Sequence, residues 1–229
     1  MEFIIVGCVA LIAILILKFM FEIRRKEWKQ LTENEELDAL AEKYPTNMEM
    51  CQEYLKKLHQ ENVKIEENEG AQASLYIAIT NKILIANIQK SYSRIQTIAH
   101  ECLHSAQNRK LLLGNFIFSN VYLLYFIIIC ALLIFKVLPY KMMFLVIFLI
   151  LSMVYSTVRV FLENDAMIKA RYLAKEYMEE KKISSAQEIE KLVDGFDKIN
   201  QVGIQYMNYS FFLDGMMKLF ILTTLGLIF

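Results

Sequence analysis

Two histidines, His100 and His104, enclose a glutamate in the pattern His-Glu-x-x-His. In a helix, side chains four residues apart lie on the same face, one turn from each other. Both imidazoles can therefore bind one metal ion from a single rigid surface, and Glu101 beside them can handle the proton of a water molecule. The chain has only 3 histidines, so the use of two of them in this pattern is a specific signal for zinc.

A catalytic zinc site needs three protein ligands and one open position. The remaining histidine, His59, falls in a charged predicted helix and is expected at the surface. A carboxylate must then complete the site, and the best candidate is Glu163. Asp165 is expected to orient one of the ligands by a hydrogen bond without binding the metal itself. The alternative for Glu163 is a helix-surface carboxylate that pairs with Arg159.

Hydrophobic residues make up 56% of the 229-residue chain, above the roughly 45–50% of soluble domains, and they are gathered in blocks. The first block, 3–21, is expected to be an uncleaved membrane anchor. The blocks 116–135 and 142–157 carry no charge and are separated by Pro139, which predicts a transmembrane hairpin with a short loop. The block 209–229 is interpreted as a fourth span or an interfacial helix.

That last block contains Asp214 and Lys218, which are four residues apart and are expected to pair on one helix face. Basic residues also predict the orientation of the chain, because cytosolic loops are rich in Lys and Arg. Such residues follow the first block and flank the histidine motif. The predicted location is therefore the cell membrane, multi-pass, with the N-terminus outside and the site on the cytoplasmic side: Arg24, Arg25, Lys26, Lys29, Lys90, Arg94, Arg109 and Lys110 carry this argument.

The predicted hairpin brings the candidate ligands together. The motif lies shortly before the second span, and Glu163 follows shortly after the third. Because a short loop returns the chain to the side it left, His100, His104 and Glu163 are expected to converge on one ion.

The polar part before the second span is expected to contain a helix and a small sheet. Thr46 is a predicted cap for a helix running to about His59, with Met48, Cys51, Leu55 and Leu58 on its apolar face. Strands are predicted at 63–69, 74–79 and 82–88, the last two joined by a tight turn at Thr80-Asn81. The helix with the histidines is expected to begin near Ser91 or Ser93. The strand 82–88 is expected to offer its edge to an extended substrate.

These elements predict a mainly α membrane protein with three or four transmembrane helices and a small β-hairpin or sheet. The expected segments are an anchor at 1–23, a cytosolic part at 24–115, the hairpin at 116–160, a cytosolic helical part at 161–208 and the C-terminal helix at 209–229. Lys+Arg and Asp+Glu are equal at 25 each, so no charge excess indicates nucleic acid as a partner. Four cysteines without Cys-x-x-Cys spacing indicate no disulfide framework, and Cys102 is interpreted as packing.

Two short segments carry a family resemblance. His100-Glu101-Cys102-Leu103-His104-Ser105-Ala106-Gln107 resembles the H-E-V-G-H-A-I-Q of membrane-bound neutral zinc metallopeptidases of the YugP type, and Glu163-Asn164-Asp165-Ala166 resembles their E-F-D-A. The layout is more distantly similar to the HtpX and CAAX-protease group of integral-membrane gluzincins. The resemblance implies a gluzincin-like zinc endopeptidase at the cytosolic membrane face. The family's glycine before the second histidine is Leu103 here, which leaves room for a narrow substrate range or a degenerate enzyme.

The expected chemistry is hydrolysis of peptide bonds in membrane or membrane-proximal proteins, with Zn²⁺ as cofactor and Glu101 as general base. Tyr206 or Tyr209 would donate to the transition state, with interfacial anchoring as the alternative for both. A non-catalytic membrane sensor or scaffold that keeps a zinc site is the competing hypothesis. A transporter has little support, and the uncharged block 116–135 argues against a soluble metallopeptidase of the ImmA type. Oligomeric state and natural substrate stay open.

Overall fold

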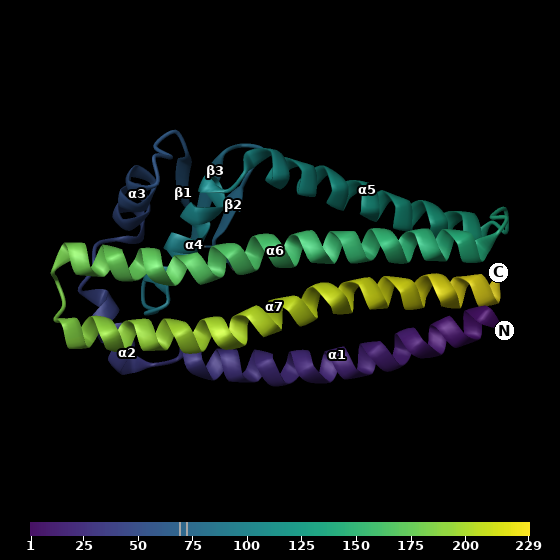
Figure 1. The fold of residues 1–229 in the computed structure, drawn as a ribbon, viewed down its shortest axis with the longest axis horizontal. Helices are drawn as coiled ribbons and strands as arrows, with labels where there is room; N and C mark the ends of the chain where they lie inside the picture. The colour runs from purple at the N-terminus through teal and green to yellow at the C-terminus, as the bar shows by residue number, and fades with distance from the viewer. Residues whose placement is uncertain (69, 72) are drawn as a thin grey trace. The chain divides into compact units, whose positions relative to one another are not determined.

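The computed structural model describes residues 1–68, 70–71 and 73–229, and the following elements belong to these residues (Figure 1). In chain order they are α1 (Glu2–Thr32), α2 (Glu35–Glu42), α3 (Asn47–Lys57), β1 (Lys64–Asn68), β2 (Leu75–Ile77), β3 (Lys82–Ala86), α4 (Arg94–Ala106), α5 (Arg109–Ile134), α6 (Lys141–Lys181) and α7 (Ala186–Ile228). The mainly helical class with a small sheet is confirmed.

The chain divides into two compact units. The first, here called the apolar unit, contains Met1–Arg25, Gly114–Phe161 and Gln205–Phe229. The second, here called the polar unit, contains Lys26–Leu113 and Leu162–Ile204.

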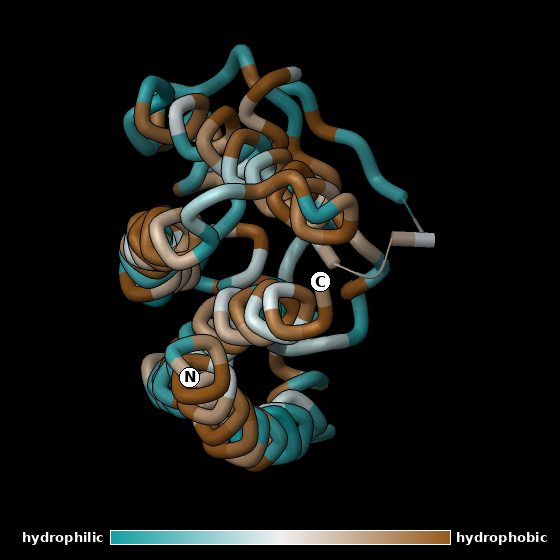
Figure 2. Tube along the Cα trace, turned by 90° about the vertical axis from the view of Figure 1, so that its right-hand side faces the viewer, coloured by the Kyte–Doolittle hydropathy of each residue, from teal (hydrophilic) through white to brown (hydrophobic). Residues whose placement is uncertain are grey.

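The helices of the apolar unit carry the predicted membrane segments. The helices α1, α5, α6 and α7 are long and apolar enough to cross a membrane, with mean hydropathies of 2.9, 2.5, 2.2 and 1.7 over their most apolar windows. Figure 2 shows hydrophobic residues recurring along the long helices. The value for α7 is the lowest of the four, because its apolar stretch contains a charged pair.

Aromatic and hydroxyl side chains join α5 to α6 in the apolar unit. Tyr122 stacks on Phe148 with ring centroids 5.3 Å apart, and its hydroxyl lies 3.3 Å from Oγ of Ser152. The hydroxyl of Tyr125 donates to the carbonyl of Phe144 at 3.1 Å. These contacts pair the two helices as the predicted hairpin requires.

The predicted pair in the last apolar block is present. Nζ of Lys218 lies 2.5 Å from Oδ2 of Asp214 and 4.9 Å from the ring centroid of Tyr122. The ammonium group is therefore held by a carboxylate and by the negative face of an aromatic ring. The side chain of Lys218 is 19% exposed and that of Asp214 47%.

The polar unit contains a three-stranded sheet in the order β1-β3-β2. Strand β1 pairs with β3 in parallel, and β2 pairs with β3 in antiparallel orientation with Tyr76 opposite Ile83. The turn before β3 contains Asn81 at φ 50°, which asparagine tolerates well. The strands are therefore where the sequence predicts them, although Glu69, the last residue of the first predicted strand, lies outside the described residues.

The expectation that β3 offers an open edge is wrong. Strand β3 is the central strand, and its backbone groups are taken by β1 on one side and β2 on the other. Parallel pairing of β1 with β3 is a long-range choice that alternation of residues does not encode. The open edges of this sheet are those of β1 and β2.

The predicted cap of α3 is confirmed. The hydroxyl of Thr46 accepts from the backbone N–H of Glu49, and the Glu49 carboxylate accepts from the backbone N–H of Thr46, which is a complete capping box. The buried face consists of Asn47, Met50, Cys51, Tyr54 and Leu55, so Met48 was wrongly placed on it, while His59 is exposed as expected.

A buried guanidinium fixes the start of α4. Arg94 is 0% exposed, and its two terminal nitrogens donate to the carbonyls of Ala41, Tyr44 and Pro45 and to Oδ1 of Asn47. These acceptors lie where α2 ends and α3 begins. One side chain thus ties the helix with the histidines to two earlier helices.

A second polar contact holds the same helix from another side. The amide of Gln96 hydrogen-bonds to Oδ1 of Asn200 on α7, and Nδ2 of Asn200 donates to the carbonyl of Met167 on α6 at 3.2 Å. Gln96 and Asn200 are each 7% exposed. Helix α4 is therefore fixed in position before its first histidine is reached.

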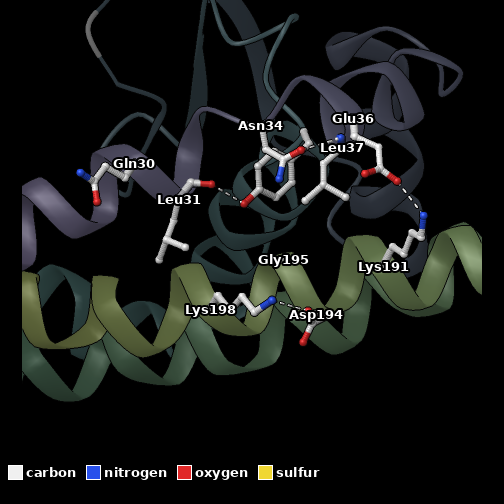
Figure 3. A pocket seen from close by; sticks show the side chains of 10 residues that line it. Gln30, Leu31, Asn34, Glu36, Leu37, Lys191, Asp194, Gly195 and Lys198 are labelled. Carbon is white, nitrogen blue, oxygen red and sulfur yellow. Dashed lines mark hydrogen bonds and ion pairs between the residues drawn. The ribbon is translucent and has the colours of Figure 1, made fainter.

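Close packing between α7 and α2 leaves a surface pocket of about 320 Å³ (Figure 3). A Cβ on Gly195 would lie 2.8 Å from Cδ1 of Leu37 and 2.9 Å from the ring of Tyr92, so a larger residue there would force these side chains to move. The charges at its rim are paired, Lys191 with Glu36 at 2.6 Å and Lys198 with Asp194 at 2.6 Å. The residues that line the pocket include no member of the histidine motif.

Candidate metal centre

Three side chains of the polar unit converge on one point. Nε2 of His100 lies 3.0 Å from Nε2 of His104, and Oε2 of Glu163 lies 3.5 Å from the first and 3.4 Å from the second. All three predicted ligands are brought together, with one ligand atom from each within 4.8 Å of the others. The side chains are 11–14% exposed, so the group is buried but not sealed.

The spacing of these atoms suits a small divalent ion. Zinc binds imidazole nitrogen and carboxylate oxygen at about 2.0–2.2 Å, so ligand atoms at tetrahedral angles lie about 3.3 Å apart. The three separations found here, 3.0, 3.4 and 3.5 Å, fall around that value. Two imidazoles and one carboxylate are also a donor set that catalytic zinc sites use. The residues present therefore fit a zinc ion.

The local geometry follows from two helices. His100 and His104 lie one turn apart on α4, and their rings meet edge to face with centroids 4.5 Å apart. Helix α4 begins at Arg94 after Ser93, as predicted, although Ser93 makes no side-chain cap bond. Glu163 belongs to α6, which continues without a break from the predicted third span into the polar unit.

The charges of the group are coupled. Burial by itself raises the pKa of Glu163, but hydrogen bonds from His100 and His104 outweigh it and hold that pKa well below its usual range. Burial lowers the pKa of His104, and the contact with Glu163 together with the charge of Glu101 overcomes this and raises it. The ionised carboxylate of Glu163 and the raised pKa of His104 therefore have the same cause, the contact between these two side chains.

Glu101 lies beside the ligands and is 7% exposed. Burial raises the pKa of its carboxyl group, while the neighbouring His100 and His104 and a backbone hydrogen bond from Tyr76 partly offset the rise. Tyr76 belongs to the edge strand β2. A carboxylate with a raised pKa is a stronger base, which suits it to accept a proton and to return it.

Asp165 contacts a ligand indirectly. Its carboxylate accepts from Nε2 of Gln107 at 3.1 Å and pairs with Nζ of Lys169 at 2.6 Å. Oε1 of Gln107 in turn lies 2.9 Å from Nδ1 of His104. Gln107 was not predicted, although its spacing of three residues after His104 places the two on one helix face.

The remaining predicted residues are two tyrosines, a cysteine and a leucine. Tyr206 and Tyr209 belong to the apolar unit, where Tyr206 stacks on Phe21 with centroids 4.7 Å apart, and their role as donors stays a prediction. Cys102 is fully buried in the core with its sulfur 3.6 Å from that of Cys51, in keeping with its interpretation as a packing residue. Leu103 packs against the same core.

Comparisons of the chain with protein-family models, with curated proteins and with solved structures found no match.

Proposed function

We propose that this protein is a membrane-embedded zinc metalloendopeptidase. The observation that carries the proposal is the convergence of His100, His104 and Glu163 beside a buried Glu101. A purely structural zinc site has four protein ligands and no use for an adjacent base. Three ligands with a base at their side are the arrangement of hydrolytic sites.

The protein's own residues have defined tasks in this reaction. When bound, zinc would lower the pKa of a water molecule and polarise the scissile carbonyl. Glu101 takes the proton of the water and delivers it to the leaving amine. The backbone N–H of Tyr76 holds the Glu101 carboxylate, which keeps the base at a fixed position beside the ligands.

The substrate class is an extended polypeptide. Strand β2 is at the edge of the sheet, and Tyr76 within it touches the proposed base. A peptide that lies along this edge would gain backbone hydrogen bonds independent of its sequence from the groups of β2 that Glu101 does not occupy. Four helices with the length and composition of membrane spans favour proteins in or beside the bilayer as substrates. The basic residues that follow the first span and flank the histidine motif favour the cytosolic side for the site.

The test uses the full-length protein in detergent micelles or nanodiscs. Zinc content is measured by mass spectrometry, and cleavage is followed on denatured casein and on a library of proteome-derived peptides. We expect about one zinc per chain, and Glu101→Gln should keep the metal and lose activity by about 10²–10⁴-fold. Glu67→Gln, which changes an exposed glutamate on β1, is the matched control.

Two results would count against the proposal. Wild-type protein that binds no zinc would remove the cofactor. Zinc-loaded wild type that is no more active than Glu101→Gln on either substrate would favour the non-catalytic sensor or scaffold.

A further inference from the structure

We infer that Gln107 is a positioning residue that sets the tautomer of His104 and joins the two helices that carry the ligands. The inference rests on the proposed function, because it assigns Gln107 to the zinc site. Gln107 follows the last residue of α4, and its side chain reaches three groups of the polar unit.

The orientation of the Gln107 amide follows from its partners. Nε2 lies 2.9 Å from the carbonyl oxygen of Leu162 and 3.1 Å from Oδ2 of Asp165. A carbonyl and a carboxylate only accept hydrogen bonds, so the nitrogen of the amide must be the atom that faces them. A flipped amide would place oxygen against oxygen twice.

This orientation decides the state of His104. Oε1 of Gln107 faces Nδ1 of His104 at 2.9 Å and can only accept, so Nδ1 must carry the hydrogen. In the neutral ring the lone pair then lies on Nε2, which is the atom that faces His100 and Glu163. The amide thus selects the tautomer that binds metal.

The same amide joins the two ligand helices. Leu162 directly precedes Glu163 on α6, and His104 lies on α4. The Gln107 side chain therefore bonds to one ligand, His104, and to the residue next to another, Glu163. Asp165 is held in turn by Lys169 at 2.6 Å. Asp165 therefore affects His104 through Gln107, because it fixes which end of the Gln107 amide faces the imidazole.

Substitutions can separate these tasks. Gln107→Met keeps the size of the side chain and removes all three contacts. Gln107→Glu keeps an acceptor for Nδ1 of His104 but turns a carboxylate towards the Leu162 carbonyl and Asp165. Adding Asp165→Asn to Gln107→Glu restores a donor opposite that carboxylate. Gln52→Met, at an exposed position of α3, is the matched control.

The measurement is the zinc affinity of the full-length protein by chelator competition, with the visible absorption of Co²⁺-loaded protein as a report on coordination. Gln107→Met and Gln107→Glu should each lose about 10–100-fold in zinc affinity and change the cobalt spectrum. The paired variant should recover most of the loss, and Gln52→Met should match wild type. The Tm of the metal-free protein should change little in all of them.

The outcomes are distinct. Wild type that binds no zinc overturns the proposed function itself. Wild type that binds zinc, with Gln107→Met equally tight and spectrally identical, overturns only the role of Gln107. A loss of affinity matched by a fall in the metal-free Tm and not recovered by the paired variant would make Gln107 a structural cap, which also overturns the inference.

Discussion

The backbone N–H of Tyr76 on the edge strand β2 donates a hydrogen bond to the carboxylate of Glu101 on α4. Every residue except proline supplies a main-chain N–H, so this contact does not depend on the side chain of residue 76. The bond also favours the ionised carboxylate and so opposes the rise in pKa that burial causes.

Removal of this donor should shift the pH profile. In Tyr76→Pro the N–H is lost, the pKa of Glu101 rises further, and the base is protonated over a wider acidic range. The acid limb of kcat/KM should therefore move to higher pH, while zinc content stays the same. Tyr76→Phe keeps the N–H and removes only the hydroxyl contact with Asn81, and it should leave the limb in place. A limb that stays fixed in Tyr76→Pro would refute the coupling.

Zinc binding should release a proton. The pKa of His104 is raised in the metal-free protein, so below that pKa its ring holds a proton that the metal must displace. Affinity should be highest above the raised pKa and should fall by about tenfold for each pH unit below it, for one proton displaced. Calorimetry in buffers of different ionisation enthalpy measures the proton count. Affinity that is constant between pH 5.5 and 8 would contradict this mechanism.

Arg94 should be essential for the fold of the polar unit. Arg94→Met removes the guanidinium that donates to the carbonyls of Ala41, Tyr44 and Pro45. We expect a loss of about 3 kcal/mol or more, seen as a fall in Tm of about 6–12 °C. Lys198→Met, which removes one exposed ion pair with Asp194, should change the Tm by little. Equal effects of the two variants would show that the buried contacts are not special.

The Asp214–Lys218 pair should behave as a unit. Asp214→Asn or Lys218→Met alone leaves one charge in the apolar stretch of α7, and each should cost about 2–3 kcal/mol in a membrane environment. The double variant removes both charges and should be nearer to wild type than either single variant. Resistance to unfolding by SDS in mixed micelles gives the comparison. Additive losses in the double variant would argue that the two residues do not interact.

The orientation can be tested by labelling. The hairpin loop is exposed at Tyr140, which is 81% accessible, and Glu67 is exposed on β1. In a background without the four native cysteines, Tyr140→Cys should react with an impermeant maleimide on intact cells, and Glu67→Cys only after lysis. The reversed pattern would place the site outside.

Much of the metal group could be predicted from local spacing. Four-residue spacing places His100 and His104 on one helix face, and the hairpin between the motif and Glu163 makes their meeting a consequence of connectivity. The residues that support the group were harder to predict. Tyr76 contributes through its main chain, which no residue type reveals, and Arg94 bonds to carbonyls rather than to an acid.

The sheet order was likewise beyond the sequence pattern. Alternation identifies strands and their buried faces, but it does not say which neighbour a strand chooses. Because β1 pairs with β3, β3 is the central strand, and β2 lies at the edge next to Glu101. The error about the edge therefore came from a long-range pairing.

The two edges of the small sheet differ in a way that affects aggregation. Strand β1 presents Lys64, Glu66 and Glu67, all exposed, along one border. Charged borders discourage strands of other molecules from pairing there. Strand β2 has no charged residue. Strands of other molecules are therefore disfavoured at the β1 edge but not at the β2 edge. The sheet is thereby protected against self-association at the β1 edge. It can still pair with an extended chain at the β2 edge, which contacts Glu101.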